Sequence, residues 1–164
     1  MKVVAGAVAV ILLCALSAAA QTAVPAGSST APPSVLVQKD VQQQLSGLAA
    51  GAKPSGLAGT TLADYGSYQI QLSVRTHSGG AEVHAHWDDV MVVEKGKATL
   101  VTGGTVVDGK TADNGETRGK RIEGGESKPI AAGDTLTVRA GTPHQLLLAP
   151  GVVFGAVIVK VHEP

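Results

Sequence analysis

The sequence predicts an all-β fold, a single barrel or sandwich preceded by one short helix. From Tyr68 onward, apolar and polar residues alternate with a period of two, as they do on a strand with one apolar face. Gly-rich turns separate further short segments of this kind at regular spacing. The chain has 164 residues, which suffice for one domain and leave little room for a second.

The first twenty residues have the composition of a secretory signal peptide. Lys2 supplies a positive charge, the run from Val3 to Leu16 is apolar, and Ala18 to Ala20 form a small-residue cleavage site. A membrane anchor is the alternative, but a span needs about 20 apolar residues and this run is shorter. Cys14 follows a leucine inside the apolar run, so lipidation is not expected. We expect residues 1–20 to be removed and the protein to be exported, periplasmic or extracellular, with no membrane attachment after cleavage.

Signal cleavage can be tested on the exported protein. Its N-terminus should be Gln21, because the small-residue triplet ends at Ala20. Mass spectrometry of protein from the exported fraction checks this expectation. An intact Met1, or a lipid on Cys14, would contradict it.

The remaining chain divides into three segments. Residues 21–34 are Pro, Ser, Thr and Ala without apolar periodicity, which predicts a flexible linker. Residues 35–61 should form a short helix and a loop, with residues 50–59 (AGAKPSGLAG) in the loop. The helix should cover one side or end of the barrel, because four apolar residues recur at helical spacing: Val37, Val41, Leu45 and Leu48. Residues 62–164 should form the β domain.

Within the β domain, each expected strand has its own pattern. Ile70, Leu72 and Val74 alternate with polar residues, so Gln69, Gln71 and Arg75 either line a cavity or face solvent. The segment 103–128 is rich in Gly and charge and predicts a long hairpin or a flap. Further strands are expected over these ranges: Glu82 to Trp87, Asp89 to Val93, Ala98 to Val107, Thr135 to Arg139, Gln145 to Leu148 and Val152 to Val161.

The composition argues against nucleic acid as a partner and against thiol chemistry. The 13 Lys and Arg residues and the 13 Asp and Glu residues are scattered, so no basic patch is visible. The aromatic residues are too few for base-stacking platforms. Cleavage of the signal would remove Cys14, the sole cysteine. A metal site must therefore use imidazole and carboxylate ligands.

Three histidines form the pattern that carries chemistry. His84 and His86 stand at i and i+2 on an expected strand, where both rings would point to one face about 7 Å apart and share one ion. His144 follows a Gly-Thr-Pro turn at the start of another expected strand. Pro143 restricts the backbone there and fixes how His144 enters the site.

These histidines and the glycines around them resemble the cupin superfamily, whose two motifs are G-x5-H-x-H-x(3–4)-E-x6-G and G-x5-P-x-G-x2-H-x3-N. The resemblance covers roughly residues 68–161. The matching residues are Gly79, His84, His86, Asp89 and Gly96 for the first motif, and Gly133, Gly141 and His144 for the second. Four positions depart from the pattern: Gly79 is one residue too near His84, Asp89 replaces Glu and lies nearer to His86, Arg139 replaces Pro, and Leu148 replaces Asn.

The resemblance implies a double-stranded β-helix, a jelly-roll barrel with the two motifs on facing strands. It implies one divalent transition-metal ion, Mn, Fe, Ni, Co, Cu or Zn, held by the three histidines and a carboxylate. Asp89 is the first candidate for that carboxylate, because strand parity groups it with Met91 and Val93, whose side chains should face the barrel interior. Glu82 is the alternative, since it shares the face of the two neighbouring histidines.

Such a site has open coordination positions, as catalytic sites require. The resemblance therefore implies a small metalloenzyme acting on a small organic molecule, in a reaction of dioxygenase, isomerase or lyase type. The alternative is a non-catalytic periplasmic module that captures a small molecule or a metal. A third interpretation is a degenerate member of the superfamily that keeps the motifs as architecture and holds no metal. The resemblance also suggests a homodimer.

Overall fold

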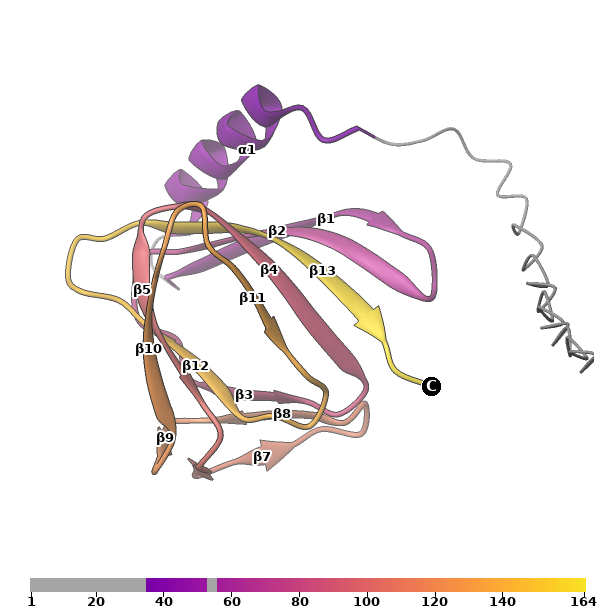
Figure 1. Ribbon diagram of the computed structural model, residues 1–164, viewed down its shortest axis with the longest axis vertical. Helices are drawn as coiled ribbons and strands as arrows, with labels where there is room; N and C mark the ends of the chain where they lie inside the picture. The colour runs from indigo at the N-terminus through magenta and orange to yellow at the C-terminus, as the bar shows by residue number, and fades with distance from the viewer. Residues whose placement is uncertain (1–34, 53–55) are drawn as a thin grey trace, which may run out of the picture. The chain divides into compact units, whose positions relative to one another are not determined.

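A computed structural model of the protein describes residues 35–52 and 56–164, shown in Figure 1. The expected signal peptide and linker lie outside the described residues. None of the described helices is long and apolar enough to span a membrane. The elements are α1 (Gln38–Gly51), β1 (Leu57–Asp64), β2 (Tyr68–Arg75), β3 (Ala81–His84), β4 (Trp87–Lys95), β5 (Lys97–Thr102), β6 (Thr105–Val107), β7 (Lys110–Thr111), β8 (Glu116–Gly119), β9 (Arg121–Glu123), β10 (Glu126–Ala131), β11 (Thr135–Val138), β12 (His144–Leu147) and β13 (Phe154–His162).

Two antiparallel sheets face each other across the interior (Figure 1). The five-stranded sheet has the order β1-β2-β13-β4-β11, and the six-stranded sheet has the order β10-β5-β12-β3-β8-β7. From β3 to β5 and again from β10 to β13, successive strands alternate between the sheets, as in a jelly roll. The predicted all-β jelly-roll barrel with a short N-terminal helix is confirmed.

Helix α1 covers the outer face of the five-stranded sheet. Val41 and Leu45 of the helix are buried against Leu72 and Val74 of β2 and Val157 of β13. Fully burying an aliphatic side chain of this kind contributes about 1.5–3 kcal/mol. The helix therefore has the covering role that its apolar spacing predicts.

The polar side chains of β2 consequently point inward. Gln69, Gln71, Ser73 and Arg75 alternate with the apolar residues under α1 and line the barrel interior. The other part of the interior is an apolar cluster that joins the two sheets: Met91, Val93, Ala98, Leu100, Ile130, Leu146, Phe154 and Ala156. Polar and apolar halves thus share one barrel, and the polar half is available for a site.

Several boundaries differ from those predicted, and the strand expected from Ala98 to Val107 is divided into β5 and β6, which lie in different sheets. β1 begins at Leu57, inside the expected loop 50–59, because this segment pairs with β2 as the edge of the sheet. The strand expected from Glu82 to Trp87 is interrupted, since β3 ends at His84 and β4 begins at Trp87. β3 and β4 belong to different sheets, so the chain must cross between the sheets in the two residues that separate them.

The Gly-rich segment 103–128 is part of the wall of the barrel. β6 and β9 form a separate pair, and β7 and β8 extend the six-stranded sheet. β8 pairs with β3 along its length, with Ala81 opposite Gly119 and His84 opposite Glu116. The segment therefore places its side chains beside the first histidine of the predicted site.

Candidate metal centre

Glu82, His84 and His144 form a group of possible metal ligands inside the barrel. Within residues 35–52 and 56–164, these three each place a ligand atom within 4.8 Å of the other two. His84 and His144 are buried, and their ring centroids lie 5.0 Å apart. N and O donors lie about 2.0–2.2 Å from a bound transition metal, which places two donors of one ion at most about 4.4 Å apart. Shifts of less than an ångström would therefore bring the group onto one ion.

Both imidazoles are held through Nδ1. Nδ1 of His84 lies 2.6 Å from Oε2 of Glu116, and Nδ1 of His144 lies 3.1 Å from the carbonyl oxygen of Thr142. With the proton on Nδ1 donated to these acceptors, the lone pair is on Nε2. Histidines that bind metals are commonly oriented by a contact of this kind. The chemistry of both rings thus fits a metal ligand.

Glu82 has one oxygen held by cations and the other near His84. Its Oε1 lies 2.6 Å from an Nη of Arg75 and 2.7 Å from an Nη of Arg118. Its Oε2 lies 3.9 Å from Nε2 of His84. Burial raises the pKa of Glu82, but the two guanidiniums outweigh burial and hold that pKa below its usual value. Glu82 is therefore a carboxylate at neutral pH, with Oε2 directed toward the imidazole.

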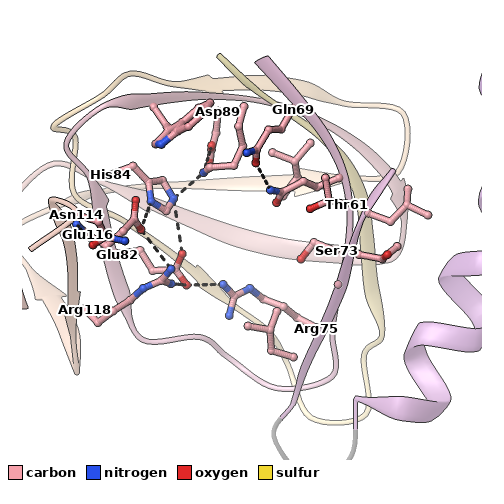
Figure 2. A pocket seen from close by; sticks show the side chains of 18 residues that line it. Thr61, Gln69, Ser73, Arg75, Glu82, His84, Asp89, Asn114, Glu116 and Arg118 are labelled. Atoms are coloured by element: carbon pink, nitrogen blue, oxygen red, sulfur yellow. Dashed lines mark hydrogen bonds and ion pairs between the residues drawn. The ribbon is translucent and has the colours of Figure 1, made fainter. Parts of the chain in front are cut away.

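On the opposite sheet, Asp89 likewise has one oxygen held by a cation and the other near His84. Its Oδ1 accepts a hydrogen bond from Nζ of Lys160 at 2.6 Å, and its Oδ2 lies 3.4 Å from Nε2 of His84 (Figure 2). Burial raises the pKa of Asp89, but the contacts with His84 and Lys160 outweigh burial and lower it. Asp89 thus offers a second carboxylate oxygen to the group.

The two histidines differ in protonation. Burial lowers the pKa of His84, but the carboxylates of Asp89 and Glu116 outweigh burial and raise it above its usual value. Burial also lowers the pKa of His144, and there it prevails. His144 is accordingly the neutral ring of the pair. In His84, by contrast, the carboxylates of Asp89 and Glu116 stabilise the protonated ring.

Strand register explains why these side chains meet. In one sheet His144 lies opposite Glu82, which lies opposite Arg118, and His84 lies opposite Glu116. Directly opposed residues on neighbouring strands share a face and are close enough to interact. In the other sheet the register aligns Gln69, Lys160 and Asp89 across β2, β13 and β4. The site forms where these rows face each other inside the barrel.

A pocket of about 540 Å³ is lined by Glu82, His84 and Asp89. His144 lines a smaller pocket of about 40 Å³, which shares Glu82 and Asp89 with the larger one. The volume of the larger pocket lies in the range of sites for small molecules. Charged residues form one part of the lining, and uncharged hydrogen-bonding residues from β1 and β2 form another (Figure 2). The charged residues are Arg75, Glu82, Asp89, Glu116, Arg118 and Lys160.

Of the residues predicted from the sequence, His84, His144, Asp89 and Glu82 are brought together, and His86 is not. His86 is exposed, and its ring stacks on that of His162 with centroids 6.4 Å apart. The expected convergence of His84 and His86 requires one strand through both residues, but β3 ends at His84 and the chain bends there. The prediction that these two rings share a strand face is therefore wrong.

Three charged contacts were not predicted. Glu116 and Arg118 come from the Gly-rich segment, and nothing in the sequence pairs that segment with β3. For Lys160 the sequence offers one weak indication of a partner, because Lys160 is a charged residue in the otherwise apolar run Phe154–Val161. A largely covered lysine in such a run needs an anionic partner, which is here Asp89.

Glu116 should act on the metal affinity through His84. Glu116→Ala removes the acceptor of the Nδ1 proton and should weaken metal binding by roughly 10–100-fold, as is usual for a contact of this type. Glu116→Gln retains a carbonyl acceptor and should cost less. Glu123→Ala is the matched control, because Glu123 is an exposed Glu in the same segment and pairs with Arg121. Isothermal titration with a divalent ion measures the differences, and equal losses in the Glu116→Ala and Glu123→Ala variants would contradict the assignment.

Comparison with known proteins finds similarity in structure and not in sequence. No family model and no curated protein matches the chain. The structure resembles TT1209 from Thermus thermophilus, with 16% identity, 68% of this chain and 89% of that chain covered, and a TM-score of 0.50. It also resembles an oxalate oxidase, with 16% identity, 68% of this chain covered and a TM-score of 0.50, and it spans 53% of that enzyme's length. At these identities the likeness establishes the fold alone.

A third similar structure is an uncharacterised conserved protein from Klebsiella pneumoniae with a double-stranded β-helix domain. It is 16% identical, 66% of this chain and 79% of that chain are covered, and the TM-score is 0.49.

Proposed function

We propose that this chain, which has the double-stranded β-helix fold of the cupins, binds one divalent transition-metal ion through Nε2 of His84, Nε2 of His144 and Oε2 of Glu82. Asp89 is the candidate for a fourth ligand. The observation that carries the proposal is the anchoring of both Nδ1 atoms by acceptors, which leaves both Nε2 lone pairs for an ion, with Nε2 of His84 3.4 Å from a carboxylate oxygen of Asp89. Imidazole and carboxylate donors suit Mn, Fe, Co, Ni, Cu and Zn.

We propose that the protein is a metalloenzyme that acts on a small organic molecule in the adjoining pocket. Two imidazoles and one carboxylate leave coordination positions open, as in the facial arrangement of non-haem iron oxygenases. A divalent ion at these ligands would polarise an oxygen of the bound molecule. Oδ2 of Asp89 lies beside the same group, 3.4 Å from Nε2 of His84, so it would be the acceptor of a proton from that molecule.

The contact between Asp89 and Lys160 favours a second function. Lys160 occupies one oxygen of the carboxylate that the enzyme would use as a base. If Lys160 keeps Asp89 away from the ligand, the protein is a binding module of the exported fraction, without catalysis.

Metal-dependent stability tests the proposal. An ion that binds only the folded barrel should stabilise metal-stripped protein by about 2.7 kcal/mol at a concentration 100 times the dissociation constant. Thermal unfolding with each of the six ions, before and after chelation, measures this. The variant with both His84→Ala and His144→Ala should show no gain. An equal gain in that variant, or no gain for the parent with any of the ions, would refute the proposed site.

A further inference from the structure

We propose that the pocket binds a hydroxylated organic anion of the sugar-acid class, with its carboxylate beside the candidate metal ligands and its hydroxyl groups against β1 and β2. This inference rests on the proposed function, because the charge of the ion is part of the argument. It goes further by stating the chemical class of the ligand.

The formal charges that line the pocket are balanced before any ion binds. Three carboxylates, Glu82, Asp89 and Glu116, face three cations, Arg75, Arg118 and Lys160. Each carboxylate lies within ion-pair distance of at least one of these cations: Glu82 of Arg75 and Arg118, Asp89 of Lys160, and Glu116 of Arg118.

A divalent ion would upset this balance. It would add two positive charges to a lining whose carboxylates already have partners. Uncompensated charge is costly in a site removed from water. A ligand with one carboxylate would reduce the excess to one positive charge, whereas a neutral ligand would leave the whole excess in place.

The cations are placed to receive a carboxylate. Arg75 and Arg118 both contact Oε1 of Glu82, on the same carboxyl group whose Oε2 faces His84. A metal ion that draws charge from Glu82 would weaken these two contacts, which leaves guanidinium N–H groups available beside the ion. The planar guanidinium fork matches a carboxylate in two parallel hydrogen bonds. The side chain of Arg118 is 56% exposed, so it can turn toward a ligand without unfolding its surroundings.

The other part of the lining selects hydroxyl groups. It consists of uncharged side chains that both donate and accept hydrogen bonds: Thr60, Thr61, Gln69, Gln71 and Ser73. An alkyl carboxylate would make no hydrogen bonds with these side chains, which are partly buried (Gln69, Gln71 and Ser73) or exposed (Thr60 and Thr61). A chain of hydroxyl groups supplies both donors and acceptors. The pocket volume of about 540 Å³ accommodates such a molecule.

The test uses D-gluconate and two matched compounds, measured by isothermal titration against metal-loaded protein. Sorbitol has the same hydroxylated chain with an alcohol in place of the carboxylate, and hexanoate has a carboxylate without hydroxyl groups. Gluconate should bind at least about tenfold more tightly than either compound, which is the effect of one charge-assisted contact. Gluconate should bind metal-stripped protein at least about tenfold more weakly than metal-loaded protein.

Variants separate binding in the pocket from chelation of the ion by gluconate itself. Arg118→Gln and Gln71→Ala should each weaken gluconate binding, and Arg118→Gln should leave sorbitol binding unchanged. Arg121→Gln is the matched control, because its side chain is 55% exposed, lies in the same segment and pairs with Glu123 outside the pocket. Arg121→Gln should bind gluconate as the parent does.

The outcomes distinguish this inference from the proposed function. If the protein binds the metal ion but binds gluconate no more tightly than sorbitol or hexanoate, the proposed function stands and the proposed ligand class is wrong. Equal losses in Arg118→Gln and Arg121→Gln would also overturn it. Failure to bind any of the six ions overturns both, and is detected in the metal titration before gluconate is added.

Discussion

His84→Ala and His144→Ala should each abolish tight metal binding, while His86→Ala should leave the affinity close to that of the parent. Loss of either buried imidazole removes a ligand, which should cost more than the roughly 10–100-fold that loss of a supporting contact costs. His86 is exposed and lies outside the ligand group. Glu82→Gln should weaken binding more than Asp89→Asn, because Glu82 belongs to the ligand group with His84 and His144 and Asp89 does not.

Isothermal titration at one fixed pH measures this ranking, since protonation of histidine otherwise alters the affinity. Circular dichroism of each variant shows whether the barrel remains folded. If His86→Ala is as damaging as His84→Ala, the bend after β3 straightens when metal binds and the three-histidine site of the sequence motif is restored.

Lys160→Met should strongly destabilise the metal-free protein. Asp89 is 4% exposed and Nζ of Lys160 lies 2.6 Å from its Oδ1, so the variant leaves a buried carboxylate without its cation. Removing one partner of a buried ion pair costs about 3–5 kcal/mol. Urea unfolding measures the loss, and Lys128→Met is the control, because Lys128 is exposed. The double variant with Asp89→Asn and Lys160→Met should regain most of the lost stability.

Metal binding should compensate for the loss of Lys160. In the Lys160→Met variant both oxygens of Asp89 are available, so a divalent ion should stabilise this variant more than it stabilises the parent. Equal stabilisation of the two proteins would show that Asp89 is not a ligand. An unfolding free energy equal to that of the parent before metal is added would show that Lys160 and Asp89 are not paired.

Sequence patterns predict the interior of this barrel better than its cross-strand contacts. The period-two pattern correctly places Asp89 with Met91 and Val93 on the buried face of β4. Helical spacing correctly predicts α1 and the burial of Val41 and Leu45, whereas Val37, expected on the same face, precedes the helix and is exposed. Both predictions depend only on the direction of side chains along one element, which the sequence of that element determines.

The remaining features depend on which strands become neighbours. Glu116 meets His84 because β8 pairs with β3, and Lys160 meets Asp89 because β13 pairs with β4. These pairings join segments far apart in the chain, and the pattern within one strand does not specify which distant strand becomes its neighbour. The placement of His86 fails for a related reason, because the bend after His84 follows from the assignment of β3 and β4 to different sheets.

Strand β13 determines when the barrel can be completed. It is the last strand in the sequence, yet it lies in the middle of its sheet, between β2 and β4. As the chain emerges from the ribosome, β2 and β4 have open edges toward each other until β13 has been synthesised. Lys160 arrives with the same strand, so the surroundings of Asp89 are completed in the same step as the sheet. This order of strands means that the five-stranded sheet cannot close before β13 has been synthesised, and such long-range pairing is slow.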